Sequence, residues 1–376
     1  MPDLVLLLEL GAIAVVFAGI PLAYLWTRSG YSFFQKLNWV VVFMTFDLIV
    51  FGAFTRLTDS GLGCPDWPGC YGTSTPFHAL SDIQQAESAL PTGPVTVMKA
   101  WIEMIHRYLA MTVGALILLQ VGIAFSKLKS IGRIPFIASL GLLLLVCIQG
   151  AFGAWTVTLK LQPIIVTIHL ILALVLFACL TAYAQQTWEE ARSSVRTLRI
   201  RLLPALLIVA SFLILFMQVF LGAWVSTNYA VLACPDFPTC LGSAWPETDW
   251  AEGFSLWREL GLNAQGEFIS PVALQTIHWA HRVFAVLVLF CLGFLGVKAY
   301  SLSTPATPLL RGFAKLLIAL LLLQVITGIS NVIFQWPLLA ALLHTAGSAA
   351  LVFCLVRMSQ WASWKSPIQM KMAKSL

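Results

Sequence analysis

The feature that most constrains this chain is a series of apolar segments, each about 20 residues long, that recurs along the whole sequence. A helix of about 20 apolar residues crosses the ~30 Å hydrocarbon core of a bilayer. The 376 residues are 59% hydrophobic and 10% charged, whereas ordinary soluble domains are about 25% charged. We therefore predict an all-α polytopic membrane protein, with membrane helices near 4–26, 37–57, 99–124, 134–157, 163–186, 202–226, 272–297, 312–333 and 337–359.

The net charge of +6 is concentrated in the short connections and does not indicate nucleic-acid binding. The connections near 127–133 and 187–201 are basic, whereas the long connections 58–98 and 227–271 carry mostly acidic residues. By the positive-inside rule, the two long loops lie outside and the carboxyl terminus is cytoplasmic. The first apolar run lacks a basic leader and a clear cleavage site, so we expect a retained helix rather than a signal peptide. The expected location is the bacterial cytoplasmic membrane.

Two long stretches of the chain repeat each other. Residues 52–72, GAFTRLTDSGLGCPDWPGCYG, match residues 222–242, GAWVSTNYAVLACPDFPTCLG, at an offset of 170. Beyond the loops the offset is 175. This pattern predicts two tandem four-helix bundles, a parallel duplication with a pseudo-twofold axis along the membrane normal. The expected parts are an extra helix (1–30), a first unit (31–188), a basic linker (189–201), a second unit (202–362) and a tail (363–376).

Four histidines in the apolar segments follow this repeat. His106 and His169 are 63 residues apart, and so are His281 and His344. Each lies five to nine residues into its predicted helix, which is about 7–14 Å below the outer surface at about 1.5 Å per residue. Two imidazoles that face each other in a four-helix bundle suit six-coordinate haem iron. The alternative is hydrogen bonding within the bundle alone.

Charged residues accompany the first histidine of each pair. Glu103 lies one helical turn before His106, and the repeat aligns it with His278. A buried carboxylate beside a haem could transfer protons. Arg107 and Arg282 directly follow the first histidines, and Arg56 lies at an outer helix end. These arginines could bind haem propionates or could extend to the aqueous interface.

The eight cysteines fall into two groups. Cys147, Cys179, Cys291 and Cys354 lie inside predicted helices, where a small apolar residue is expected. The others form two Cys-x5-Cys motifs in the loops, Cys64 with Cys70 and Cys234 with Cys240. Because these loops are expected outside the cell membrane, disulfides are favoured there and would each contribute about 2 kcal/mol. They could stiffen the loops or exchange thiols with a partner.

With these residues in place, the chain resembles the haem A synthase family. The resemblance covers about residues 37–360 and rests on EMIHR, the three further helix histidines and the CPDWPGC loop. It implies two four-helix bundles and oxidation of a methyl group of haem O to the formyl group of haem A, for terminal oxidases. It further implies that His106 and His169 hold the substrate haem, that His281 and His344 hold a haem b cofactor, and that Glu103 is catalytic.

The resemblance also implies partners: haem O with the haem O synthase that supplies it, and an electron acceptor, either a quinone or a redox protein. The lipid bilayer is the surrounding medium. The sequence leaves open whether the protein forms a homo-oligomer. Two other functions fit the residues, a non-catalytic di-haem cytochrome that exchanges electrons with quinone and a membrane thiol oxidoreductase. Glu103, which occurs in one unit only, favours the enzyme.

Overall fold

The computed structural model describes residues 32–192, 203–305 and 307–363, together with a few isolated positions before residue 32. The chain forms two compact units, Met1–Trp188 and Glu189–Leu376. The predicted helix 4–26, most of the predicted linker and most of the tail lie outside the described residues.

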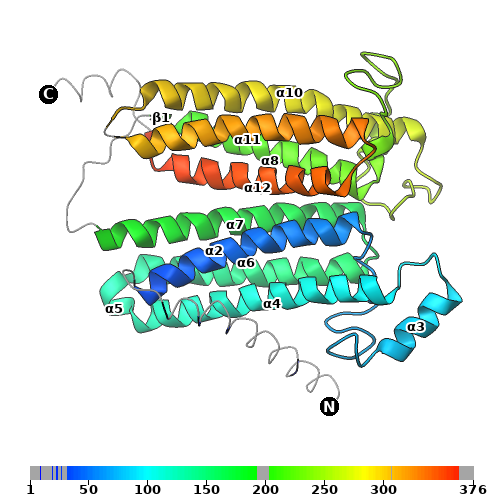
Figure 1. Ribbon diagram of the computed structural model, residues 1–376, viewed down its shortest axis with the longest axis horizontal. Coiled ribbons are helices and arrows are strands. Elements are labelled where there is room, and N and C mark those ends of the chain that lie inside the picture. Colours follow the sequence, from blue (N-terminus) through cyan, green and yellow to red (C-terminus); the bar gives the residue numbers. More distant parts are fainter. Residues whose placement is uncertain are drawn as a thin grey trace. The chain divides into compact units, whose positions relative to one another are not determined.

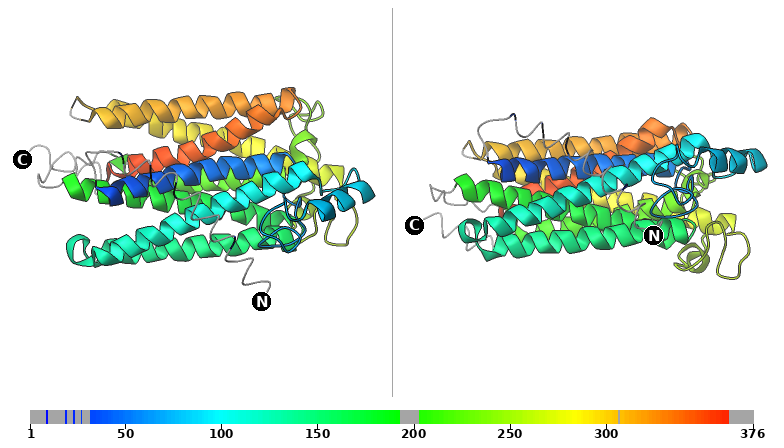
Figure 2. Two further views of the ribbon diagram at one scale, coloured as in Figure 1. Left: turned by 60° about the horizontal axis from the view of Figure 1, so that its bottom comes forward. Right: turned by 90° about the horizontal axis from the view of Figure 1, so that it is seen from below.

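The first unit is built on four long helices. Figure 1 shows them side by side, and Figure 2 shows the same arrangement in two further views. They are α2 (Phe33–Leu57), α4 (Val97–Ser126), α6 (Arg133–Thr158) and α7 (Pro163–Arg192). The long connection between α2 and α4 contains α3 (Leu80–Ala89), and the short connection between α4 and α6 contains α5 (Leu128–Ile131). The long loop therefore lies at one end of this bundle and the short basic connection at the other.

The second unit has the same plan. Its long helices are α8 (Ala205–Thr227), α10 (Pro271–Leu302), α11 (Pro308–Ile333) and α12 (Leu338–Ser359). The contacts between them run from α8 to α10, α11 and α12 and back to α8, which closes the bundle. The long loop between α8 and α10 contains η1 (Ala230–Leu232) and α9 (Trp250–Gly253). Two short strands, β1 (Leu203–Pro204) and β2 (Ala362–Ser363), pair in parallel beside the first and last of these helices.

Local sequence explains where the helices begin. Ser32 caps α2 in a capping box with Gln35, and the Thr96 hydroxyl accepts a hydrogen bond from the Lys99 N–H at 3.2 Å at the start of α4. Ser270 caps α10, whose first residue is a proline. Caps bind N–H groups that have no partner inside the helix, and proline lacks the N–H that would be unpaired there.

The outer faces of the long helices are apolar. Phe43, Ile134, Leu213 and Phe290 are 67–73% exposed although each lies near or within a long helix. Eight described helices are long and apolar enough to cross a membrane. Water solvates such large apolar surfaces unfavourably. A surrounding of lipid therefore explains why these side chains are exposed. The prediction of an all-α polytopic membrane protein is confirmed; the pseudo-twofold relation stays a prediction.

Candidate functional site

The first pair of predicted ligands lies inside the first unit. His106 is on α4 and His169 is on α7, two long helices of the same bundle. In both rings Nδ1 is buried and has no hydrogen-bond partner. The His106 ring stacks on Phe51, with ring centroids 6.3 Å apart and planes 8° from parallel. The structure therefore brings together the two histidines that the sequence paired and leaves a polar atom of each unsatisfied.

The second pair lies inside the second unit. His281 on α10 and His344 on α12 have ring centroids 6.4 Å apart. The Thr327 hydroxyl lies 2.9 Å from Nδ1 of His344, and the Gln218 amide nitrogen lies 3.1 Å from Nδ1 of His281. Each Nδ1 of this pair therefore has a polar neighbour.

All four imidazoles lie directly against the backbone of a neighbouring helix at a glycine. A Cβ placed on Gly222 would lie 2.9 Å from Cε1 of His281, and one on Gly52 would lie 3.0 Å from Cε1 of His106. The corresponding distance is 3.3 Å for Gly153 to His169 and for Gly328 to His344. Because carbon atoms in contact are about 3.5–4.0 Å apart, any side chain at these glycines would crowd the rings.

This donor set fits haem. Among the described residues, no three His, Cys, Asp or Glu side chains come together as a site for a bare metal ion. A haem iron needs only two axial ligands from the protein, and paired imidazoles are one such set. A metal–imidazole bond is about 2 Å long, so two rings with centroids 6.4 Å apart can bond one iron between them. The residues present therefore fit a haem.

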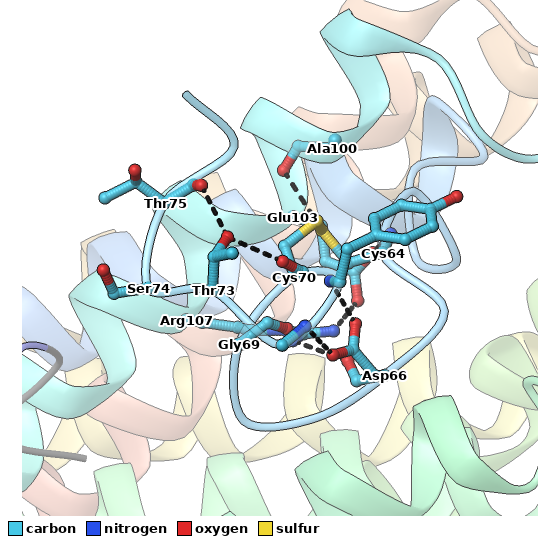
Figure 3. The surroundings of a disulfide bond; sticks show 12 residues. Cys64, Asp66, Gly69, Cys70, Thr73, Ser74, Thr75, Ala100, Glu103 and Arg107 are labelled. Carbon is cyan, nitrogen blue, oxygen red and sulfur yellow. Dashed lines mark hydrogen bonds and ion pairs between the residues drawn. A yellow bond between two sulfur atoms is a disulfide. The ribbon is translucent and has the colours of Figure 1, made fainter. Parts of the chain in front are cut away.

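Glu103 is buried beside the first pair, with 3% of its surface exposed. Its carboxylate accepts a hydrogen bond from the Cys64 backbone N–H at 2.8 Å and forms an ion pair with Arg107. Figure 3 shows these groups around the loop disulfide. Gly63 makes the approach possible, because a Cβ there would lie 2.4 Å from the Lys99 carbonyl carbon on α4. The carboxylate is thus held by both the loop and its own helix.

Arg107 fastens the first loop to α4. Its guanidinium donates to the carbonyl of Asp66 at 2.8 Å, to that of Pro68 at 3.3 Å and to that of Gly69 (Figure 3). Three loop carbonyls and one carboxylate therefore surround a single buried cation. The predicted contact of Arg107 with a haem propionate stays a prediction.

Arg282 does the same in the second unit. It donates to the carbonyls of Cys234 at 2.6 Å, Asp236 at 2.7 Å and Thr239 at 2.9 Å. Its Nε donates to Nε2 of His278 at 3.1 Å, so an imidazole stands where the first unit has the Glu103 carboxylate. A propionate contact of Arg282 is likewise a prediction.

Both predicted disulfides are present, Cys64–Cys70 and Cys234–Cys240. All four sulfur-bearing residues are fully buried, so the bonds are shielded from other thiols. Within the second loop, the Asp236 carboxylate accepts bonds from the Thr239 hydroxyl and the N–H groups of Leu241 and Gly242. These bonds, that of Thr239 above all, lower the pKa of Asp236 to about 2, because they stabilise its charged form.

Arg56 lies at the end of α2 and pairs with Asp59, with 3.2 Å between Nη1 and Oδ1. Its propionate contact also stays a prediction. Sequence reasoning missed Gln218 and Thr327 as neighbours of the histidines. Their signal was a departure from the repeat, which places Leu48 and Phe152 at the matching positions.

An aromatic groove lies on the second unit beside the helix that carries His281. Its volume is about 440 Å³, and Leu221, Trp245, Trp250, Phe254 and Trp279 are among the residues that line it. Trp279 is 9% exposed, and its indole nitrogen is buried without a hydrogen-bond partner. The groove is therefore almost wholly apolar, and one of its lining residues has a buried N–H without a partner among the described residues.

Known proteins resemble this chain over nearly its whole length. The profile of the cytochrome oxidase assembly protein family matches residues 35–356. A haem A synthase of Shewanella oneidensis is 38% identical over 340 residues, which is 88% of this chain and 98% of that protein. One of Caulobacter vibrioides is 30% identical over 83% of this chain and 91% of its own length, and one of Sinorhizobium fredii is 27% identical over 89% and 91%.

Proposed function

The chain belongs to this cytochrome oxidase assembly family of haem A synthases, and from that premise we propose that it oxidises a methyl group of haem O to the formyl group of haem A. The observation that carries the proposal is Glu103. This carboxylate is buried one turn from His106 and is held by the Cys64 N–H and Arg107. The second unit has His278 at the matching position.

We propose different tasks for the two histidine pairs. His106 and His169 would hold the substrate, haem O, in the catalytic unit 31–188. His281 and His344 would be the axial ligands of a haem b in the unit 202–362. When bound, haem b supplies one-electron transfer. The buried position of all four rings keeps them neutral and available as ligands, because charging an imidazole in an apolar bundle is unfavourable.

Oxidising a methyl group to a formyl group removes four electrons and brings in one oxygen atom. Protons leave with the electrons, so a group that can accept them has to lie near the reacting carbon. Glu103 is suited to this, because its carboxylate is one turn from His106. Arg107 fixes that carboxylate and ties down the loop, which restricts the access of bulk water to the site.

The alternatives account for fewer of these contacts. A non-catalytic di-haem cytochrome needs no carboxylate in one unit only. A thiol oxidoreductase needs sulfur atoms that another thiol can reach, whereas the four loop cysteines are fully buried. The haem A synthase activity is therefore the better proposal.

The electrons need an acceptor, for which we propose a membrane quinone. A quinone has an apolar ring that suits the aromatic groove. One of its carbonyl oxygens would accept a hydrogen bond from the Trp279 N–H, which is buried without a partner. Residues of α10 line the groove, and α10 also carries His281. A helix with its side chains is about 10–12 Å across, so a quinone in the groove would lie within about one helix width of His281. We further propose a bacterial cytoplasmic membrane location, with the cysteine loops outside and the carboxyl terminus inside, and a haem O synthase as the supplier of substrate.

The test is co-expression with a haem O source, followed by chromatography of the extracted haems. We expect Glu103→Gln, which is nearly isosteric, to keep both histidine pairs loaded but to lose most of the conversion. His278→Gln is the matched control in the second unit and should lose far less. If Glu103→Gln yields haem A at the wild-type level, the catalytic role of this carboxylate is wrong, and the electron-transfer cytochrome becomes the better explanation.

A further inference from the structure

The two histidine pairs differ in the atoms that touch Nδ1. In the first unit, Nδ1 of His106 and of His169 is buried without a partner. In the second unit, Nδ1 of His344 lies 2.9 Å from the Thr327 hydroxyl, and Nδ1 of His281 lies 3.1 Å from the Gln218 amide nitrogen. Both histidines of the second pair thus have a polar neighbour at Nδ1, whereas neither histidine of the first pair has one.

Thr327 sets the protonation of His344. Its hydroxyl already donates a hydrogen bond to the Leu323 carbonyl on its own helix, at 2.7 Å. The oxygen therefore meets Nδ1 of His344 as an acceptor, which requires the proton of the neutral ring to be on Nδ1. This tautomer leaves the lone pair of Nε2 free for a metal. The Thr327 hydroxyl therefore favours the tautomer of His344 that can bind a metal through Nε2.

Gln218 can do the same for His281. Its amide oxygen is buried and has no partner, while its amide nitrogen is near Nδ1. A half-turn of the terminal amide exchanges the two atoms. The oxygen then accepts the Nδ1 proton and again leaves Nε2 free, in exchange for the 3.3 Å bond that the amide nitrogen otherwise donates to the His281 carbonyl. A bound metal that requires this tautomer would favour the exchanged rotamer.

Among the described residues the first unit has no such acceptor at Nδ1; the Gln149 amide nitrogen instead lies 3.4 Å from Nε2 of His169. At an offset of 170, Leu48 stands where the second unit has Gln218, and at an offset of 175, Phe152 stands where it has Thr327. The Phe152 ring packs on Trp155, with centroids 5.0 Å apart. Neither a leucine nor a phenylalanine side chain can accept a proton from Nδ1, so nothing at these positions fixes the tautomer of His106 or His169.

We propose that Gln218 and Thr327 are positioning residues that retain a haem in the second unit, and that Leu48 and Phe152 let the first unit release its haem. The inference rests on the proposed function, in which one haem stays as cofactor and the other passes through as substrate and product. A partner that accepts the second ring proton of a ligating histidine fixes its orientation and raises its basicity. Loss of such a partner typically weakens metal binding about 10–100-fold.

The test measures haem dissociation from the purified holoprotein into excess apomyoglobin, with absorption spectra and the midpoint potential of the remaining haem. We expect Thr327→Val, which keeps the shape but removes the acceptor, to speed the loss of haem b about 10–100-fold. Gln218→Leu should act in the same direction. Thr327→Ser should restore slow release. Thr345→Val is the matched control, because that hydroxyl bonds only to the Ala341 carbonyl of its own helix.

The reciprocal exchange tests the first unit. In protein loaded by co-expression with a haem O source, Leu48→Gln combined with Phe152→Thr should slow the release of haem from His106 and His169. The midpoint of thermal unfolding identifies any variant that fails to fold. A folded variant in which this haem is released as fast as in the wild type contradicts the proposal.

The outcomes separate this inference from the proposed function. If Thr327→Val and Gln218→Leu release haem b at the wild-type rate while His344→Ala loses it, the positioning role is wrong and the ligand assignment stands. If His344→Ala keeps its haem with unchanged spectra, the ligand assignment itself fails. Faster release in both acceptor variants, with rescue by Thr327→Ser, supports the inference.

Discussion

Gly222→Ala tests most directly how the histidines are held. The new Cβ would lie 2.9 Å from Cε1 of His281. Carbon contacts are normally about 3.5–4.0 Å, so the ring has to move by roughly 0.6–1.1 Å or the helices have to separate by as much. A metal–ligand bond tolerates an error of only about 0.2 Å. The ring could therefore not keep the position that the proposed bond to a haem iron requires.

We expect Gly222→Ala to lower the haem b content of the purified protein at least tenfold. Gly328→Ala should have a smaller effect, because its Cβ would lie 3.3 Å from Cε1 of His344. The assay is the ratio of haem to protein, from the pyridine haemochrome spectrum, together with the thermal midpoint of the haem-free protein. Alanine in place of glycine favours a helix by about 0.5–1 kcal/mol, so the haem-free protein should not be destabilised by helix propensity.

Gly293→Ala is the control on the same unit, since a Cβ there would have no neighbour within 4 Å. It should keep all its haem and gain a little stability. The reasoning is refuted if Gly222→Ala binds haem as fully as Gly293→Ala does. Equal loss in Gly293→Ala would also refute it, because helix propensity rather than ring contact would then be the cause.

Two further predictions concern the second unit. Asp236 has a pKa lowered from 3.8 to about 2, so its stabilising bonds are complete above pH 4 and are lost as the pH falls toward 2. The intrinsic fluorescence of the loop should therefore change below pH 3 in the wild type, whereas Asp236→Asn should show no transition there; identical acid titrations would contradict this. Trp279→Phe removes the indole N–H and should lower co-purified quinone and the rate of haem b oxidation by quinone several-fold. Trp257→Phe is the control, because Trp257 is 69% exposed and does not line the groove, and unchanged quinone content and rate in Trp279→Phe would exclude this N–H as a quinone donor.

The fold was largely predictable because the bilayer imposes one solution on long apolar segments. Every backbone polar group in hydrocarbon needs an internal partner, and a helix provides it. The predicted segment 99–124 is thus the helix Val97–Ser126, and 312–333 is part of Pro308–Ile333. The loops carry no such constraint. Their short helices depend on features that hydropathy does not report: α9 is capped by the Asp249 side chain, and both α3 and α9 contact long helices of their own unit.

The site was predictable in its pairs but not in its contacts. The spacing of 63 residues within each pair predicted that His281 would meet His344, and their rings are 6.4 Å apart. That Arg107 would bind three loop carbonyls could not be read from the sequence. A guanidinium has five donors, which backbone carbonyls as well as carboxylates can accept, so its partners depend on where a distant loop folds.

The two units share one set of arginine contacts but differ in the residue beside it. Arg107 and Arg282 each bind three carbonyls of a disulfide-bonded loop, so both loops are held by contacts that do not involve the residue one turn earlier, and in the first unit Glu103 adds a bond from the Cys64 N–H. That earlier residue is free to differ, and it is Glu103 in one unit and His278 in the other. The arginine of the first unit forms an ion pair with the Glu103 carboxylate, whereas that of the second unit donates a hydrogen bond to the His278 imidazole. A carboxylate in one unit and an imidazole in the other thus differ at a single position beside the same arginine contacts.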